Sequence, residues 1–419
     1  MLTTHIGGMS EQLINLAPTP YHRELVDYLR SQERELWNWF SSAQAKTEYT
    51  ESLRLALLKT TYRLDADAHP DLVRSADEAK TALGLDFPLT LYQAQQSDQL
   101  NASLYYIPGE GHLVLSGPLL ATLTPIELKS VLGHELAHYL LWQREGGIFL
   151  IADRILQALA DDPRSAPPHE QSAQWYRLYT EIFADRGSLT VTNDLNSVVS
   201  GLVKVATGLH QVSGASYLKQ ADEIFAQSKV KTEGLSHPET FIRARALRFW
   251  AAHDPGAESL VTAMIEGEAT LQDLDLLAQL RLTGLTRKII TELLAPKWFQ
   301  SEPVLAHARL FFNDFKPVSS NEPGVLNTLT FEDPKLREYF AYLLLDFVVA
   351  DRELEDLPLA AAWEMACKLG IESSFEKLLA NELKLKSREL KRLKQDASET
   401  LKQAESASAP IPDQAGSVQ

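Results

Sequence analysis

The chain has 419 residues, of which 45% are hydrophobic and 23% charged, a composition typical of a folded globular protein rather than a disordered one. This length exceeds what one compact core usually accommodates and predicts two or three domains. With 40 Lys and Arg against 56 Asp and Glu, the formal net charge is −16. So acidic a chain is ill suited to binding nucleic acid through its phosphates or an anionic membrane surface. The single cysteine, Cys367, excludes an intramolecular disulfide framework and a cysteine-rich metal cluster.

Neither a signal peptide nor a membrane span is expected. Residues 1–20 lack a basic stretch followed by an apolar run. The most apolar internal run, residues 146–160, is interrupted by Asp153 and Arg154 and is shorter than the roughly 20 apolar residues that cross a bilayer. We therefore expect a soluble, cytoplasmic protein.

In chain order, the predicted elements are mostly helices around one β-rich segment. Residues 20–65 carry apolar side chains at three- and four-residue spacing, which predicts helix. Residues 71–95 predict a helix followed by a strand, and residues 102–117 predict two short strands about a turn at Pro108-Gly109. Beyond Leu119 nearly all of the chain has a helical pattern. The expected fold class is mainly α with a small β-sheet, an α+β arrangement.

Residues 131–142, VLGHELAHYLLW, contain a His-Glu-x-x-His pentad on a predicted helix. The segment Thr124-Pro125-Ile126-Glu127 before it is a capping box with proline at the first helical position. The buried stripe of this helix is predicted from leucines at four-residue spacing: Leu128, Leu132, Leu136 and Leu140.

His134 and His138 share a different face of the same helix. Two imidazoles one turn apart can bind one Zn²⁺, and Glu135 beside them can take a proton from the metal-bound water. A hydrogen-bonded histidine pair on a buried helix is the alternative explanation of the pentad taken alone.

A catalytic zinc site needs a third protein ligand and an open position for water. Glu181 and Asp185 lie four residues apart in TEIFADRGSL, so both can sit on one face of a later helix. Glu181 would be the third ligand, and Asp185 can accept the other N–H of a ligating histidine. A solvated helix face is the alternative. The apolar neighbours at 182–184 indicate instead that at least one carboxylate points inward, where a metal would supply its charge partner.

Three motifs in this order, VLGHELAHYL, TEIFADRGSL and SHPETFIRARAL, resemble the HtpX-like and CAAX-prenyl-protease-type zinc metallopeptidases. These are gluzincins, in which a glutamate is the third zinc ligand. The resemblance covers residues 66–250. It implies one zinc ion per chain, held by His134, His138 and Glu181, with Glu135 as general base and later proton donor.

The resemblance also implies roles for residues around this site. His237, in the His-Pro element, would approach the developing oxyanion; a histidine that caps the helix before Pro238 is the alternative. Arg243 would pair with an acidic group such as Asp185, or hold its helix to the core. The strand near His112–Ser116 resembles the edge strand on which a substrate backbone is laid. Many relatives are embedded in membranes, but the segment between His138 and Glu181 is not a transmembrane hairpin, so membrane-protein quality control and prenyl-protein processing are not carried over.

The segment REYFAYLLLDFVVADRELEDLPLAAAWEMACKLGI resembles TerB-like helical domains, named for tellurite resistance. The similarity lies in a hydrophobic helix ending in Ala350-Asp351, an acidic turn that includes Glu353, and a helix closing in Leu369-Gly370. These carboxylates can bind a divalent cation, but the turn lacks the glycine of a calcium loop, so helix capping is the favoured explanation. Such a module implies a protein partner, or a restraint on the peptidase.

The predicted architecture is a zincin-type metallopeptidase domain followed by an all-α TerB-like domain. The expected division is an N-terminal helical region at 1–65, a zinc metallopeptidase domain at 66–253, a helical connector at 254–329, the TerB-like domain at 330–403 and a disordered tail at 404–419. The expected function is a zinc-dependent endopeptidase acting on a peptide or protein substrate. The alternatives are a self-inhibited or non-catalytic peptidase-fold scaffold that acts through protein–protein interaction, and a zinc hydrolase of non-peptide substrates.

Overall fold

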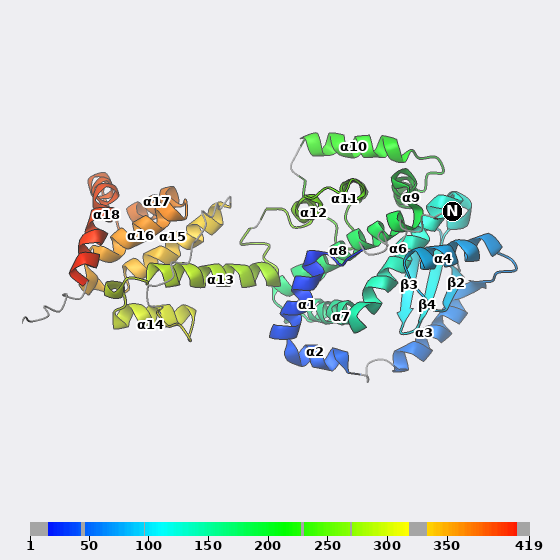
Figure 1. Ribbon diagram of the computed structural model, residues 1–419, viewed down its shortest axis with the longest axis horizontal. Helices are drawn as coiled ribbons and strands as arrows, with labels where there is room; N and C mark the ends of the chain where they lie inside the picture. Colours follow the sequence, from blue (N-terminus) through cyan, green and yellow to red (C-terminus); the bar gives the residue numbers. More distant parts are fainter. Residues whose placement is uncertain are drawn as a thin grey trace, which may run out of the picture. The chain divides into compact units, whose positions relative to one another are not determined.

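The computed structural model describes the residues in six segments: 16–42, 47–95, 97–227, 230–268, 270–317 and 333–408. These segments form helices and one small sheet (Figure 1), which confirms the predicted fold class. The N-terminal stretch before Leu16 and most of the predicted disordered tail lie outside the described residues. None of the described helices is long and apolar enough to cross a membrane.

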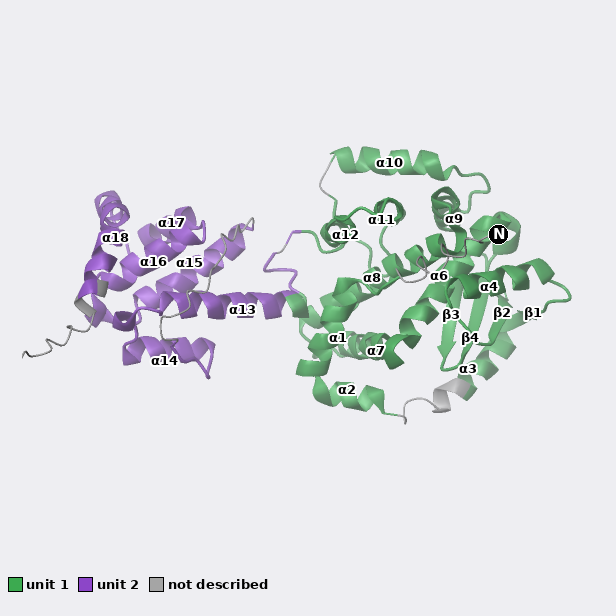
Figure 2. Cartoon of the chain, in the orientation of Figure 1, with its two compact units in different colours: residues 1–267, 275–277 green, residues 268–274, 278–419 purple. Residues whose placement is uncertain are grey.

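The chain divides into two compact units (Figure 2), each with its own apolar core. Unit 1 comprises residues 1–267 and 275–277, and unit 2 comprises residues 268–274 and 278–419. The segments expected to form the N-terminal helical region and the metallopeptidase domain both lie in unit 1. The segment expected to be TerB-like lies in unit 2, and the expected connector contributes to both units.

One mixed sheet of four strands lies in unit 1, in the order β1-β2-β4-β3. β1 (Thr61–Leu64) pairs antiparallel with β2 (Leu89–Ala94), and β2 pairs parallel with β4 (Glu110–Ser116). β4 pairs antiparallel with β3 (Asn101–Ile107), which completes the predicted hairpin. The hairpin turns at Gly109, whose φ of +86° favours glycine. Since β4 is paired on both sides, β3 is the free edge next to it.

Besides this sheet, the described residues of unit 1 form helices (Figure 1). In chain order they are α1 (Pro20–Gln32), α2 (Arg34–Ser41), α3 (Thr47–Thr60), α4 (Pro70–Ala82), α5 (Leu119–Thr122), α6 (Pro125–Gln143), α7 (Ile148–Asp161), α8 (Pro167–Thr192), α9 (Leu195–Thr207), α10 (Gly214–Gln227), α11 (Thr240–Ala251) and α12 (Ala257–Ile265). α6 is central: it packs against α8 along its length, and against α4, α7, α9 and β3.

The regular secondary structure in the described residues of unit 2 is entirely helical. In chain order its helices are α13 (Leu276–Leu293), α14 (Glu302–Phe311), α15 (Pro334–Val348), α16 (Leu357–Lys368), α17 (Glu372–Glu382) and α18 (Ser387–Ser408). The first five residues of the predicted tail, 404–408, therefore continue α18. In the acidic turn, the Asp351 carboxylate accepts the N–H of Glu353 at 3.0 Å and caps a short 3₁₀ turn, as the helix-capping explanation expects.

α6 forms where its local sequence predicts it. The Thr124 hydroxyl accepts the Glu127 N–H at 3.4 Å, and the Glu127 carboxylate accepts the Thr124 N–H at 2.8 Å, so the predicted capping box is confirmed. Glu127 also binds two side chains of α9: Lys204 Nζ at 2.8 Å and Ser200 Oγ at 2.6 Å. Burial acts to raise the pKa of Glu127, but these partners hold it below its ordinary value. The ion pair therefore anchors the start of α6 to α9.

Two glycines allow α6 and α8 to pack closely. A Cβ atom at Gly187 of α8 would overlap the side chain of Ala137 and lie 3.1 Å from the carbonyl oxygen of Gly133. A Cβ atom at Gly133 of α6 would in turn lie 3.0 Å from the side chain of Val191. The backbones of α6 and α8 can approach this closely only because both positions lack a side chain.

We expect Gly187→Ala to destabilise unit 1 by about 1–3 kcal/mol, because the added methyl group must separate the two helices or strain their side chains. Chemical denaturation followed by circular dichroism measures this change. Gly284 of α13 is a matched control, since a Cβ atom there meets nothing within 4 Å. Alanine at Gly284 should be neutral or stabilise by up to about 1 kcal/mol. Wild-type stability in Gly187→Ala would contradict the close packing.

Candidate metal centre

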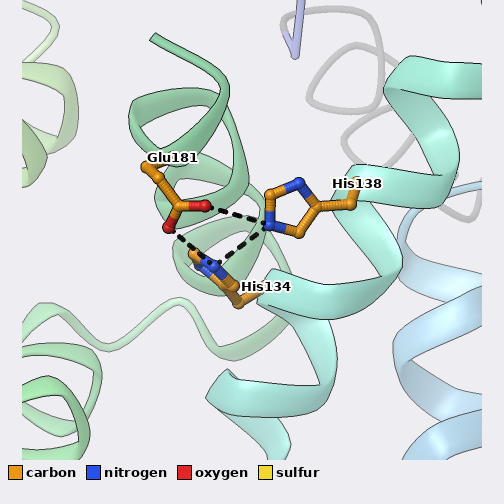
Figure 3. Close-up of side chains that lie close together, drawn as sticks. All are labelled: His134, His138 and Glu181. Atoms are coloured by element: carbon orange, nitrogen blue, oxygen red, sulfur yellow. Dashed lines mark hydrogen bonds and ion pairs between the residues drawn. The ribbon is translucent and has the colours of Figure 1, made fainter. Parts of the chain in front are cut away.

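Two histidines of α6 and a glutamate of α8 converge in unit 1 (Figure 3). His134 Nε2 lies 3.3 Å from His138 Nε2 and 3.3 Å from Glu181 Oε2, and His138 Nε2 lies 3.5 Å from Glu181 Oε1. Ligands bound to one tetrahedral ion at about 2.0–2.1 Å are about 3.3–3.4 Å apart. The three donors are thus spaced to share one ion. Within the described segments, this is the single group of three His, Cys, Asp or Glu side chains so placed.

The hydrogen-bonding state of the cluster also fits a metal ion. Glu181 Oε2 is buried and makes no hydrogen bond with a described residue. Burial lowers the pKa of His138 to about 4, so its imidazole is neutral and keeps a lone pair for a metal. Burial also acts to lower the pKa of His134, but the carboxylates of Asp185 and Glu181 raise it to about 10. A metal that binds His134 must therefore displace a proton.

Asp185 lies behind His134 and is itself held by Arg243 of α11. The Asp185 Oδ1 atom is 3.1 Å from His134 Nδ1. The Arg243 guanidinium donates twice to this carboxylate, from Nη2 to Oδ1 at 2.6 Å and from Nε to Oδ2 at 2.8 Å. Burial acts to raise the pKa of Asp185, but Arg243 keeps it below its ordinary value, so the carboxylate stays ionised. An ionised partner at Nδ1 leaves Nε2 of His134 as the ligating atom.

Glu135 lines the same cavity as the three donors. The residue is 7% exposed, and its carboxylate accepts the backbone N–H of Leu104 in β3. Burial raises its pKa to about 7, although the positive charge of His134 opposes the rise. A carboxylate with a pKa near neutrality can both accept and return a proton.

His237 also lines this cavity, from the loop that precedes α11. Its Nε2 atom is 3.6 Å from Glu181 Oε2, and its Nδ1 atom is 2.9 Å from Ser236 Oγ. The side chain is 58% exposed. The N-cap residue of α11 is Glu239, so the alternative that His237 caps this helix is wrong.

The cavity has a volume of about 630 Å³ and is bounded on one side by residues 101–104 of β3. The expectation that His112–Ser116 is the edge strand beside the site is therefore wrong. Those residues belong to β4, which is enclosed between β2 and β3, and His112 is buried with its Nδ1 3.2 Å from the Tyr92 hydroxyl. The continuous apolar run of β4 was the available signal, because such runs are typical of interior strands.

Sequence reasoning also missed Trp142, which lies one turn beyond His138 on α6. Its ring stacks on the His138 imidazole with a centroid separation of 5.4 Å and an interplanar angle of 30°, and it lines the cavity. The four-residue spacing from His138 was the signal for this contact. Trp142 thereby limits the rotation of a candidate ligand.

We expect Asp185→Asn to weaken metal binding about 10–100-fold, because a neutral amide supports the imidazole of His134 less well than a carboxylate does. Competition with a chromophoric chelator for Zn²⁺ or Co²⁺ measures this affinity. Asp194→Asn is the matched control: Asp194 caps α9 through the N–H groups of Asn196 and Ser197, and asparagine caps equally well. Equal affinity in Asp185→Asn and wild type would show that Asp185 does not support the site.

Part of the chain is similar to a known protein family. Residues 67–159 match Peptidase family M48. Plastoglobule-localized metallopeptidase 48, chloroplastic, from Arabidopsis thaliana is 30% identical over 204 residues, which cover 44% of this chain and 57% of the relative. The chain therefore aligns with little more than half of the relative's length. No solved structure matches significantly.

The matched range contains β2 to β4, α6 with the pentad, and most of α7, whereas Glu181 follows it on α8. A cytoplasmic location stays a prediction, since the name of the relative places that protein in chloroplasts. Metallopeptidases of this family depend on a metal, and the three converging side chains can hold one. Residues 67–159 are thus similar to the M48 peptidase family, and Glu181, outside this range, completes a cluster of side chains able to bind a metal.

Proposed function

We propose that the protein is a zinc-dependent endopeptidase that hydrolyses peptide bonds in the cavity along α6 and α8. The observation that carries the proposal is the spacing of His134, His138 and Glu181, with Glu135 in the same cavity. Two imidazoles and one carboxylate are a ligand set of catalytic zinc sites. The match to the M48 peptidase family and the metallopeptidase relative support the class of reaction.

Each residue of the site has a role in this proposal. His134, His138 and Glu181 would hold zinc, which when bound activates water and polarises the carbonyl group. Glu135 accepts a proton from the attacking water and delivers it to the leaving amine. The Leu104 N–H orients the Glu135 carboxylate for both transfers. His237 donates a hydrogen bond toward the carbonyl oxygen as its negative charge develops.

The substrate backbone is proposed to bind along β3. The N–H of Leu104 points away from β4, because it donates to Glu135. In an antiparallel pair the outward-facing residues alternate, so Ala102 shares this orientation. Its N–H is taken by Asn101 Oδ1 at 2.9 Å. The carbonyl groups of Ala102 and Leu104 are therefore aimed at the open edge, where they can accept hydrogen bonds from an extended substrate.

We expect Glu135→Gln to lower peptide cleavage by at least about 10²–10⁴-fold, because glutamine cannot accept the proton. Zinc content, measured by mass spectrometry, should stay at about one per chain, since the proposed ligands are intact. The control is Glu145→Gln, which alters an exposed glutamate paired with Arg23 and should keep full activity.

Full activity in Glu135→Gln would refute the proposed mechanism. Zinc binding without cleavage by the wild-type protein would favour the alternative, a self-inhibited or non-catalytic scaffold. Chelation should abolish cleavage and added Zn²⁺ should restore it, and failure of this rescue would reject zinc as the metal.

For unit 2 we propose the TerB-like role of recruiting a protein partner or restraining the peptidase. Its support is a separate helical core that leaves large apolar side chains exposed, with Leu310 at 80% and Val349 at 55%. Both α13 and α14 contribute to that core, so removing residues 330–419 alone would expose their apolar faces.

A chain that ends at residue 277 is therefore the better test of this role. We expect its cleavage of a protein substrate to change relative to the full chain, while its metal content does not. Unchanged cleavage rates on both peptide and protein substrates, together with unchanged protein binding, would refute the proposed role of unit 2.

A further inference from the structure

The cavity runs along two antiparallel helices. Near one end, Ser188 Oγ of α8 donates to the carbonyl oxygen of Ser130 of α6 at 2.8 Å. The candidate metal ligands follow in the middle, and Trp142 and Arg177 line the other end. The stretch of α6 from residue 131 to 142 is about 16 Å long at 1.5 Å per residue. About five residues of an extended peptide span this distance.

The two ends of the cavity differ in chemistry. At the Ser130 end, α9 supplies apolar side chains, including Val198 and Leu202. At the Trp142 end, α7 supplies Asp153 and α8 supplies Arg177. The cavity therefore has an apolar end and a polar end on opposite sides of the candidate metal ligands.

The charged groups at the polar end act on each other electrostatically but are not hydrogen-bonded to one another. Neither Asp153 nor Arg177 forms a hydrogen bond or an ion pair with any residue in the described parts of the chain. Burial raises the pKa of Asp153 to about 6, even though Arg177 and Arg154 act to lower it. A desolvated carboxylate and an unpaired guanidinium that line one cavity are free to bind a ligand.

We propose that Asp153 and Arg177 form a specificity subsite for a substrate side chain that both donates and accepts hydrogen bonds, namely glutamine or asparagine. This inference rests on the proposed endopeptidase function. A carboxamide oxygen accepts from Arg177 while its NH₂ group donates to Asp153. A lysine or arginine would be repelled by Arg177, and a glutamate or aspartate by Asp153. An apolar side chain would leave both protein groups unpaired.

The position of this subsite along the substrate follows from the helix. Arg177 precedes Glu181 by four residues, which is about 6 Å along α8. An extended peptide advances about 3.3 Å per residue. The selected side chain therefore lies within about two residues of the bond that is cleaved.

Mass-spectrometric profiling of cleavage sites in a peptide library tests the subsite. We expect wild-type protein to favour Gln and Asn over Leu about tenfold or more at one position within two residues of the cleaved bond, because each partly buried polar group that loses water without gaining a hydrogen bond weakens binding. Asp153→Asn should shift the preference at that position to Glu and Asp, since Arg177 then acts alone. Arg177→Gln should shift it to Lys and Arg. Arg154→Gln is the matched control, because Arg154 lies near Asp153 but does not line the cavity, and its profile should equal that of wild type.

Two outcomes separate this inference from the proposed function. Identical profiles for wild type, Asp153→Asn and Arg177→Gln would overturn the subsite while leaving peptide cleavage established. If the wild-type protein does not cleave peptides, the endopeptidase proposal fails. The subsite is then tested by binding: the affinities of Glu135→Gln protein are measured for peptides that differ only in having Gln, Leu, Glu or Lys at one position. A preference for Gln that Asp153→Asn and Arg177→Gln shift in opposite directions supports it, and equal affinities reject it.

Discussion

The close contact between α6 and α8 is the constraint on which the candidate site depends. His134 and His138 come from one helix and Glu181 from the other, so the separation of the two backbones sets the spacing of the three donors. Gly133 and Gly187 permit that separation, because a Cβ atom at Gly187 would overlap Ala137 and one at Gly133 would crowd Val191. The spacing of the donor atoms is therefore a property of helix packing rather than of the pentad alone.

Electrostatics explains why this contact suits a cation. Two buried carboxylates, Glu181 and Asp185, lie on one face of α8, and Arg243 balances Asp185 through two hydrogen bonds. Glu181 Oε2 makes no hydrogen bond with a described residue. A buried carboxylate is costly without a counter-charge, and a divalent cation between Glu181 and two imidazoles would provide one. Arg243 hydrogen-bonds Asp185 and lies 3.7 Å from Glu181 Oε2, so the proposed zinc would add to a positive charge already near Glu181.

The sheet contributes both to the proposed chemistry and to the proposed binding of substrate. The Leu104 N–H, which orients Glu135, belongs to β3. A substrate would lie along this same strand. The base and the substrate would then be positioned by one rigid element, which reduces the misplacement to which proton transfer is sensitive. The unpaired charges of Asp153 and Arg177 lie farther along the same cavity, where a substrate side chain rather than its backbone would meet them.

The sequence by itself determined the local features of this protein. The capping box before α6, its leucine stripe, the pentad, the four-residue spacing of Glu181 and Asp185 and the β3–β4 hairpin are all read from neighbours in the chain, because helix and strand periodicity are local. A strand outside the hairpin decided which of its two strands is the free edge. Because β2 pairs parallel with β4, β3 is left as the edge strand at the cavity. The convergence of Asp153 with Arg177, and the support of Glu135 by Leu104, likewise join elements with no shared local pattern. Only tertiary packing decided these, because it depends on the complementary shapes of surfaces far apart in the sequence.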